Sequence, residues 1–529
     1  MLTKTQICGM KSNQKMKVFI LLTVLIPLSV QSSSANIRHS QVKRNVLVMI
    51  GDDAGFESQI YNNSVCKTPN LNKLAERSLI FKHSYTSVSS CSPSRSAILT
   101  GLPEHQNGMY GLHNGYHHFE SFEEVRSLPF ILNQSNIRTG LIGKKHVGPE
   151  DVYPFEFEYS GENNPILQVG RNITLMKELA HKFFQTQDER PFFLYIGFHD
   201  PHRCGHTLPQ YGQFCEKFGN GEPGMGKIVD WKPTLYDPAD VIVPYFVQDT
   251  PVARADLAAQ YTTISRLDQG IGLILGELEA AGHLDDTLII YSSDNGIPFP
   301  YGRTNAYEPS TAEPLLVSSP LHPERKGQVT EAFASLLDIV PTVLDWFNIT
   351  YPSYSLQKKK IVQLTGTSLL PVLKSEPAKG FDAAFMSQDL HEITMFYPMR
   401  ALRTRNMRLI HNLNFKMPFP IDQDFYISRT FQDILNRTRQ GEPLHWFSSL
   451  ERYYYRPEWE LFDMDSDPQE TTNVAKNAKY ASVFREMKEQ LLAWQNVTAD
   501  PFICYPWGVL QDSGAYKEHN KCFPLDNGL

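Results

Sequence analysis

Two pairs of oxygen-bearing side chains stand directly after apolar stretches of this chain. Asp52 and Asp53 follow one stretch, and Asp294 and Asn295 follow another after two serines. Carboxylate and amide oxygens suit a hard divalent cation such as Ca²⁺, whereas metals that prefer thiolate or imidazole would want other ligands. The alternative is that Asp-Asp and Asp-Asn-Gly are only turn residues. Because two such ends occur in predicted strands of one sheet, we favour a metal site.

Further candidates are the cationic side chains that could hold an anionic group under nucleophilic attack. Lys144 and His146 stand two apart after a third apolar stretch, so both face one side if strand geometry persists. His202 ends a fourth stretch. A histidine can protonate a leaving group, and its ordinary pKa near 6.5 leaves it largely charged in an acidic compartment. The alternative is a structural histidine, since the chain contains 17 of them.

Cys91 opens a run of small and polar residues that contains one arginine. The run reads Cys91-Ser92-Pro93-Ser94-Arg95-Ser96-Ala97-Ile98-Leu99-Thr100-Gly101. Arg95 lies one short helical turn from Cys91, and the N-terminus of such a helix favours an anion. Taken alone, Cys91 would be a buried structural cysteine as often as a reactive one. The complete run makes a chemical role the better interpretation.

The apolar stretches alternate with helical patterns, which is typical of an α/β fold. We predict strands over Asn45–Ile50, Thr139–Ile142, Pro191–Phe198 and Thr287–Tyr291. The carboxyl ends of parallel strands meet at one edge of a sheet, where ligands bind. The candidate residues of all four segments are therefore expected to converge on one site.

Apolar residues at helical spacing predict a core helix over Arg254–Ala281 and an amphipathic helix over Ala332–Phe347. Pro and Gly indicate a surface connection over Ser353–Gly380, and its run Lys358-Lys359-Lys360 favours a solvated loop over a glycan-binding patch.

After residue 385 the pattern changes to that of a smaller α+β domain. Met407–Asn412 is expected to be an edge strand, Trp459–Asp463 another strand and Lys476–Trp494 a terminal helix.

The chain of 529 residues has the composition of a globular protein, with 41% hydrophobic and 20% charged residues. Residues 1–35 are expected to be a signal peptide, with a basic lead and an apolar core, Val18–Val30, too short for a membrane span. Removing its four lysines takes the net charge from −7 to about −11. This negative net charge disfavours non-specific binding of polyanions, so an anionic substrate needs a local basic pocket. We expect a soluble protein of the secretory route.

Six Asn-x-Ser/Thr triplets follow the predicted signal and favour a glycoprotein with these positions in exposed segments. They are Asn62, Asn133, Asn172, Asn348, Asn436 and Asn496.

The cysteines outside the predicted signal fit an oxidising compartment. Cys204–Cys215 and Cys504–Cys522 are the simplest disulfides, which leaves Cys66 as a free buried thiol. Structural zinc is the competing interpretation, but neither pair has the short Cys-x2–4-Cys spacing.

Together these motifs resemble the sulfatase family, within the alkaline-phosphatase-like superfamily, along nearly the whole mature chain. The resemblance is carried by the Cys91 run and by Gly51-Asp52-Asp53, Gly143-Lys144-Lys145-His146, Ser293-Asp294-Asn295-Gly296 and Glu460-Leu461-Phe462-Asp463. It implies an α/β fold with a large mixed sheet flanked by helices and a smaller C-terminal α+β domain with an antiparallel sheet. The implied domains are residues 36–385 and 386–529.

Longer strings are similar to a subgroup of sulfatases that act on N-sulfated glucosamine. They are Ser87–Ser90, Gly108–His113, Phe198–His206 and Asn412–Pro420. The similarity implies a lysosomal sulfuric-amide hydrolase that removes the N-sulfate of non-reducing-end glucosamine in heparan sulfate. The nearest alternative is an O-sulfatase acting on another glycosaminoglycan. A phosphohydrolase would use Ser or Thr and zinc, and a glycan-binding protein without activity would have lost one of the key residues.

The family resemblance also implies roles for individual residues. Cys91 would be oxidised to formylglycine, whose hydrate attacks sulfur, and one Ca²⁺ per chain would be bound by Asp52, Asp53, Asp294, Asn295 and the modified Cys91. Arg95, Lys144, His146 and His202 would hold the nucleophile and the sulfo group, with His202 or a neighbour protonating the leaving amine. Many sulfatases have a Lys shortly after Asp-Asn-Gly; here Arg303 takes that place as a substrate-binding residue that cannot readily donate a proton. The implied partners are heparan sulfate fragments, the formylglycine-generating enzyme and a second copy of the chain, with no nucleic acid and no membrane after signal removal.

Overall fold

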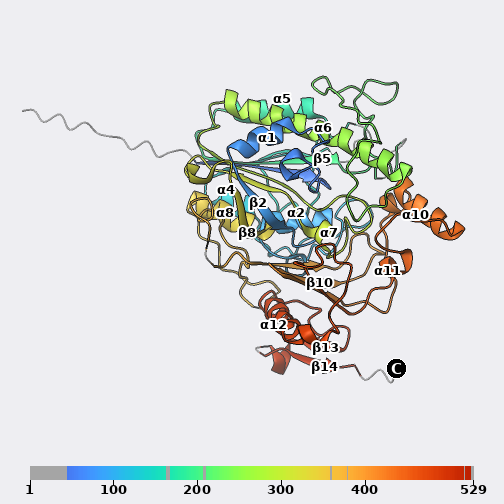
Figure 1. Cartoon of the computed structure of the whole chain (residues 1–529). Helices are drawn as coiled ribbons and strands as arrows, with labels where there is room; N and C mark the ends of the chain where they lie inside the picture. The colour runs from blue at the N-terminus through green and yellow to red at the C-terminus, as the bar shows by residue number, and fades with distance from the viewer. Residues whose placement is uncertain are drawn as a thin grey trace, which may run out of the picture. The chain divides into compact units, whose positions relative to one another are not determined.

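Strand β1 (Asn45–Asp52) lies inside an eight-stranded mixed sheet (Figure 1). The computed structural model describes residues 44–161, 167–205, 210–357, 360–377, 379–517 and 519–525, so the predicted signal peptide, His206 and two lysines of the 358–360 run lie outside the described residues. The strand order is β4 (Phe157–Tyr159), β3 (Arg138–Gly143), β5 (Phe192–Pro201), β1, β6 (Thr287–Ser293), β7 (Leu315–Ser318), β2 (Leu79–Tyr85) and β8 (Val329–Ser335). The four predicted strands are therefore adjacent, and all four run parallel. Among the described strands of this sheet, only β7 is antiparallel to its two neighbours.

Helices cover both faces of this sheet, as Figure 1 shows. The side chains of β1 alternate, so that Val46 and Val48 pack on one face and Leu47 and Met49 on the other. The first face is covered by α2 (Cys91–Thr100), α4 (Leu128–Gln134) and α8 (Ile339–Phe347), and the second by α1 (Pro69–Glu76), α5 (Ile173–Phe184) and α6 (Pro251–Ala280). Two short helices, α3 (Glu104–Asn107) and α7 (Glu308–Thr311), lie in the connections. The predicted core helix is α6.

A second, antiparallel sheet follows, in the order β12 (Trp459–Asp463), β11 (Met407–Asn412), β10 (Met399–Thr404) and β9 (Ala383–Gln388). Helix α12 (Ala481–Val497) packs its apolar side on it through Leu491 and Trp494. The remaining α-helices and strands of the described chain are α9 (Gln423–Tyr426), α10 (Arg429–Gln440), α11 (Leu450–Tyr454) and the hairpin β13 (Gly508–Gln511) with β14 (Lys521–Pro524). The expected fold class is confirmed, while the domain boundary at residue 385 stays a prediction.

Two details of the sequence prediction are wrong. Met407–Asn412 is not an edge strand, because β11 pairs with both β10 and β12, and its Arg408 is buried against Glu308 and Glu470. The segment Ala332–Phe347 is not one helix, because β8 continues to Ser335, which forms a capping box with Asp338 before α8 begins.

Both predicted disulfides are present, Cys204–Cys215 and Cys504–Cys522, and Cys66 is a buried free thiol. Within the described ranges, none of the helices combines the length and the apolar character that crossing a membrane requires.

Candidate active site at the carboxyl ends of the parallel strands

The predicted metal ligands lie together where β1 and β6 end side by side. Asp52 is the last residue of β1, and Asp294 follows the last residue of β6. The Asp53 backbone N–H donates to Asp294 Oδ1 at 3.1 Å, and Asn295 Nδ2 donates to Asp53 Oδ1 at 2.6 Å. All four side chains are fully buried. The register of two parallel strands thus produces the predicted convergence.

Cys91 is the first residue of α2, and its thiol faces these acids. One ligand atom each of Asp52, Asp294 and Cys91 lie within 4.8 Å of one another, and so do those of Asp53, Cys91 and His202. Burial raises the pKa of the Cys91 thiol well above its ordinary value, although Lys144 opposes this. An unmodified thiol here would therefore rarely be a thiolate and would be a weak nucleophile.

Arg95 and Lys144 place two fixed positive charges beside Cys91 and the acids. Arg95 Nη2 lies 2.9 Å from Asp294 Oδ2 and 3.2 Å from Asp52 Oδ1. Lys144 Nζ donates to Asp52 Oδ2 at 2.6 Å. Although burial opposes its charge, the Asp52 carboxylate holds the pKa of Lys144 above its ordinary value. Both residues can therefore bind an anion, and Lys144 is a poor proton donor.

His146 is brought to the same region, but not by the predicted geometry. Strand β3 ends at Gly143, and both Gly143 and His146 have positive φ, so strand alternation does not relate Lys144 to His146. The loop nevertheless buries His146 within electrostatic reach of Lys144, Asp52 and Arg95. Burial, reinforced by Lys144, lowers the pKa of His146 well below its ordinary value, so the side chain is neutral.

His202 and Arg303 occupy another side of the cluster. His202 Nε2 lies 3.7 Å from Asp53 Oδ2 and 3.4 Å from Arg303 Nη1, and the Arg303 guanidinium also pairs with Asp53. Burial lowers the pKa of His202 to about 4, despite the attraction of Asp52. The ordinary pKa of histidine suggested a side chain that is largely charged under mild acidity. With its lowered pKa, His202 is instead largely neutral there.

The donor set fits a hard divalent cation. Burial raises the pKa of Asp294 to about 8 and that of Asp53 to about 6, with Asp52 adding to both shifts. Asn295 Oδ1 is buried and accepts no hydrogen bond from the described residues. Three crowded carboxylates and an unused amide oxygen are the arrangement that an oxygen-binding cation would stabilise.

Sequence reasoning missed three residues that the C-terminal part brings to this site. Arg303 Nη2 lies 2.7 Å from Asp424 Oδ1 and 3.1 Å from Asp422 Oδ2. His391 Nδ1 lies 2.8 Å from the hydroxyl of Ser90, next to Cys91. No local motif marks them, and their contacts span more than a hundred residues of sequence.

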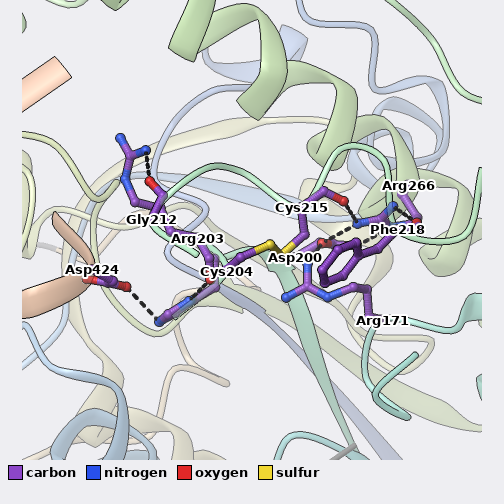
Figure 2. The surroundings of a disulfide bond; sticks show 10 residues. Arg171, Asp200, Arg203, Cys204, Gly212, Cys215, Phe218, Arg266 and Asp424 are labelled. Atoms are coloured by element: carbon purple, nitrogen blue, oxygen red, sulfur yellow. Dashed lines mark hydrogen bonds and ion pairs between the residues drawn. A yellow bond between two sulfur atoms is a disulfide. The ribbon is translucent and has the colours of Figure 1, made fainter. Parts of the chain in front are cut away.

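Disulfide Cys204–Cys215 lies directly after His202 and beside a buried ion network (Figure 2). Arg266 pairs with Asp200 and also donates to the carbonyls of Cys215 and Phe218. Cys215 and Phe218 are thereby fixed to α6 and to the end of β5.

The sequon asparagines differ in exposure. Asn62, Asn348, Asn436 and Asn496 are exposed, whereas Asn133 and Asn172 are half-buried. Asn133 Nδ2 donates to the Pro154 carbonyl, and Asn172 caps α5.

Comparison with solved structures identifies this architecture as the fold of sulfatases. A structure of a protein in complex with its substrate D-glucosamine-2-N,6-O-disulfate aligns with a TM-score of 0.61 at 20% identity, over 87% of this chain and 98% of that one. The family model named Sulfatase matches residues 44–349. The chain belongs to the sulfatase family, whose members generally use a metal ion and a formylglycine.

Its curated relatives differ widely in similarity. The human N-sulphoglucosamine sulphohydrolase is 62% identical over 92% of this chain and 96% of its own length. The N-acetylglucosamine-6-O-sulfatase of Bacteroides thetaiotaomicron is 24% identical over 89% of this chain and 90% of its own. An ulvan-active sulfatase of Formosa agariphila is 25% identical over 86% of this chain and 75% of its own length.

Proposed function

We propose that this chain is a sulfamidase that hydrolyses the N-sulfate of non-reducing-end N-sulfoglucosamine in heparan sulfate. The observation that carries the proposal is its 62% identity, over 92% of the chain, with a relative named for that reaction. Relatives named for O-sulfate substrates are far less similar, at 24% for the N-acetylglucosamine-6-O-sulfatase.

Cys91 is proposed as the precursor of formylglycine. Its position at the N-terminus of α2, facing Asp52 and Asp294, suits a group that must approach both a cation and an anionic substrate. The hydrated aldehyde would supply the hydroxyl that attacks sulfur, which an unactivated thiol at this buried position cannot do efficiently. Arg95, fixed by Asp52 and Asp294, would orient that hydroxyl.

Asp52, Asp53, Asp294 and Asn295 would hold one Ca²⁺ together with the modified Cys91. The cation would polarise the sulfo oxygens and reduce the cost of deprotonating a hydroxyl. Two observations support this metal site. The donor set consists of oxygen atoms, and burial raises the pKa of Asp294 to about 8, a shift that a neighbouring cation would offset.

The remaining residues would bind the sulfo group and move a proton. Lys144 keeps its charge, and Arg303 presents a fork of donors, so both suit sulfo oxygens. His146, neutral and buried, can accept or share a proton close to Lys144. His202 or a neighbouring histidine would give a proton to the leaving nitrogen as the bond to sulfur breaks.

The cellular setting is proposed on the family resemblance. We infer a lysosomal glycoprotein that enters the secretory pathway through a signal peptide, receives its formylglycine from the formylglycine-generating enzyme and acts on heparan sulfate fragments as a homodimer. Four exposed sequons and two disulfides are compatible with that route.

The experiment is sulfate release from N-sulfoglucosamine by the wild type and by Cys91→Ala. We expect release by the wild type, and none by the variant, which keeps its fold. Cys66→Ala is the matched control, because it removes the other free buried thiol of the described residues and leaves the site intact. Release from 6-O-sulfated but not from N-sulfated glucosamine would favour an O-sulfatase instead.

A further inference from the structure

The C-terminal part of the chain places a carboxylate pair against Arg303 in the proposed active site. Asp422 precedes the short helix α9, and Asp424 lies within it. Asp424 Oδ1 lies 2.7 Å and Asp422 Oδ2 3.1 Å from the same nitrogen, Nη2 of Arg303. Both carboxylates are buried, and neither was assigned by the sequence motifs.

The two carboxylates differ in their second oxygen. Asp422 Oδ1 accepts from the backbone N–H of Phe425 at 2.9 Å, so this residue also caps α9. Asp424 Oδ2 instead lies 3.9 Å from His202 Nε2. Asp424 thus faces the proposed proton donor, and Asp422 faces its own helix.

His202 presents one defined nitrogen to that side. Its Nδ1 lies 2.6 Å from the carbonyl oxygen of Arg203, which can only accept, so Nδ1 carries a proton. Nε2 is therefore the atom that can gain a proton, and its neighbours are Arg303 Nη1 and the carboxylates of Asp53 and Asp424.

Charge is divided unequally across the site. Beside Cys91, Arg95 and Lys144 supply two positive charges. At the His202 side, three carboxylates surround the single guanidinium of Arg303. Asp53 is a proposed ligand of the cation, but Asp422 and Asp424 alone outnumber the single positive charge of Arg303, so a group that leaves toward His202 enters a region with surplus negative charge.

We propose that Asp424 is a specificity-determining residue that favours an amine over an alcohol as the leaving group. When the S–N bond breaks, its electron pair stays on nitrogen, the sulfo group passes to the nucleophile, and nitrogen takes a proton from solvent. The free amine then takes a further proton from solvent and becomes an ammonium, for which Asp424 is the counter-ion. An alcohol released from an O-sulfate stays neutral and gains nothing from that carboxylate. This inference rests on the proposed sulfamidase function.

The test compares Asp424→Asn with Asp422→Asn, using glucosamine and inorganic sulfate as separate probes. We expect Asp424→Asn to weaken glucosamine binding about tenfold, the value of one charge-assisted hydrogen bond, while sulfate binding changes less than about twofold. Asp422→Asn removes an equal charge from Arg303 but does not face His202, so its effect on glucosamine is expected to be clearly smaller. Asp424→Glu restores the charge and should recover part of the affinity.

Calorimetry gives both affinities without turnover, so the result does not depend on which sulfate bond the enzyme cleaves. The sulfamidase function itself fails separately, if the wild type releases no sulfate from N-sulfoglucosamine. Unchanged glucosamine affinity in Asp424→Asn, or an equal loss of glucosamine and sulfate affinity in both variants, would overturn the role of Asp424. An equal loss in both variants would mean that Asp422 and Asp424 serve only to hold Arg303.

Discussion

Arg266 Nε lies 2.6 Å from Asp200 Oδ2, and its Nη2 lies 2.8 Å from Asp200 Oδ1, with both side chains buried. Arg171 pairs with the same carboxylate. Asp200 lies between His199 and His202, so a network beneath the site sets the path of the chain that carries His202. Figure 2 places this network beside the disulfide Cys204–Cys215.

Asp200→Asn is expected to lower the free energy of unfolding by about 3–5 kcal/mol, because two buried guanidinium groups lose their shared counter-ion. Denaturant unfolding gives this value. Glu331→Gln is the control, since it breaks ion pairs with half-exposed Lys82 and Arg405 and should cost far less. Equal losses for the two variants would contradict a structural role of the buried network.

Removal of either disulfide should lower stability, but only removal of the first should lower activity. Each closes a short loop, with sequence separations of 11 and 18, and each should contribute about 3 kcal/mol to stability. Cys204→Ser with Cys215→Ser should also reduce kcat, because Cys204 follows His202 by two residues. Cys504→Ser with Cys522→Ser should leave kcat unchanged. Equal kcat values in both double variants, measured on folded protein, would exclude a positioning role for the first loop.

Metal removal is expected to reduce both activity and stability. Added Ca²⁺ should raise the unfolding temperature of stripped protein, with about 2.7 kcal/mol gained at a hundredfold excess over Kd. Protons compete with the cation at Asp294 and Asp53, because burial raises the pKa values of these residues to about 8 and about 6. The affinity for Ca²⁺ should therefore fall as the pH decreases from about 8 to about 6. Asn295→Ala should diminish the Ca²⁺-dependent shift. A chelator-insensitive enzyme with no such shift would argue against the site.

Glu104→Gln tests a buried acid outside the proposed active site. Burial, together with Asp389, raises the pKa of Glu104 well above its ordinary value. The folded state therefore holds a proton that the unfolded state loses above pH 4.5, and this makes the folded state less stable as the pH rises. Glutamine does not titrate and so avoids that loss of stability. The unfolding temperature of the variant should exceed that of the wild type at pH 7.5 and equal it near pH 4. A difference that does not vary with pH would contradict this account.

The sheet and the convergence of the site could be predicted, because each strand ends in its own polar signature. Asp52, Lys144, His202 and Asp294 follow four apolar stretches, and parallel strands necessarily bring such ends to one edge. Both disulfides followed from local cysteine pairs in an oxidising compartment.

The contribution of the C-terminal part could not be predicted. Asp424 reaches Arg303 across 121 positions of sequence, and the intervening chain carries no periodic signal that fixes the docking of α9. The shifted pKa of His202 was also beyond sequence reasoning, because it depends on burial by distant segments. The burial of Arg408 in β11 was equally beyond sequence reasoning, because its partners Glu308 and Glu470 lie far from it in the sequence.

The central claim is that Cys91 becomes an aldehyde. Peptide mass analysis of the segment containing residue 91, from active protein made in cells with the modifying enzyme, tests it directly. We predict the mass deficit of thiol-to-aldehyde conversion, absent from Cys91→Ala and tracking specific activity across preparations. Fully active protein whose Cys91 peptide retains the mass of an intact thiol would contradict the account.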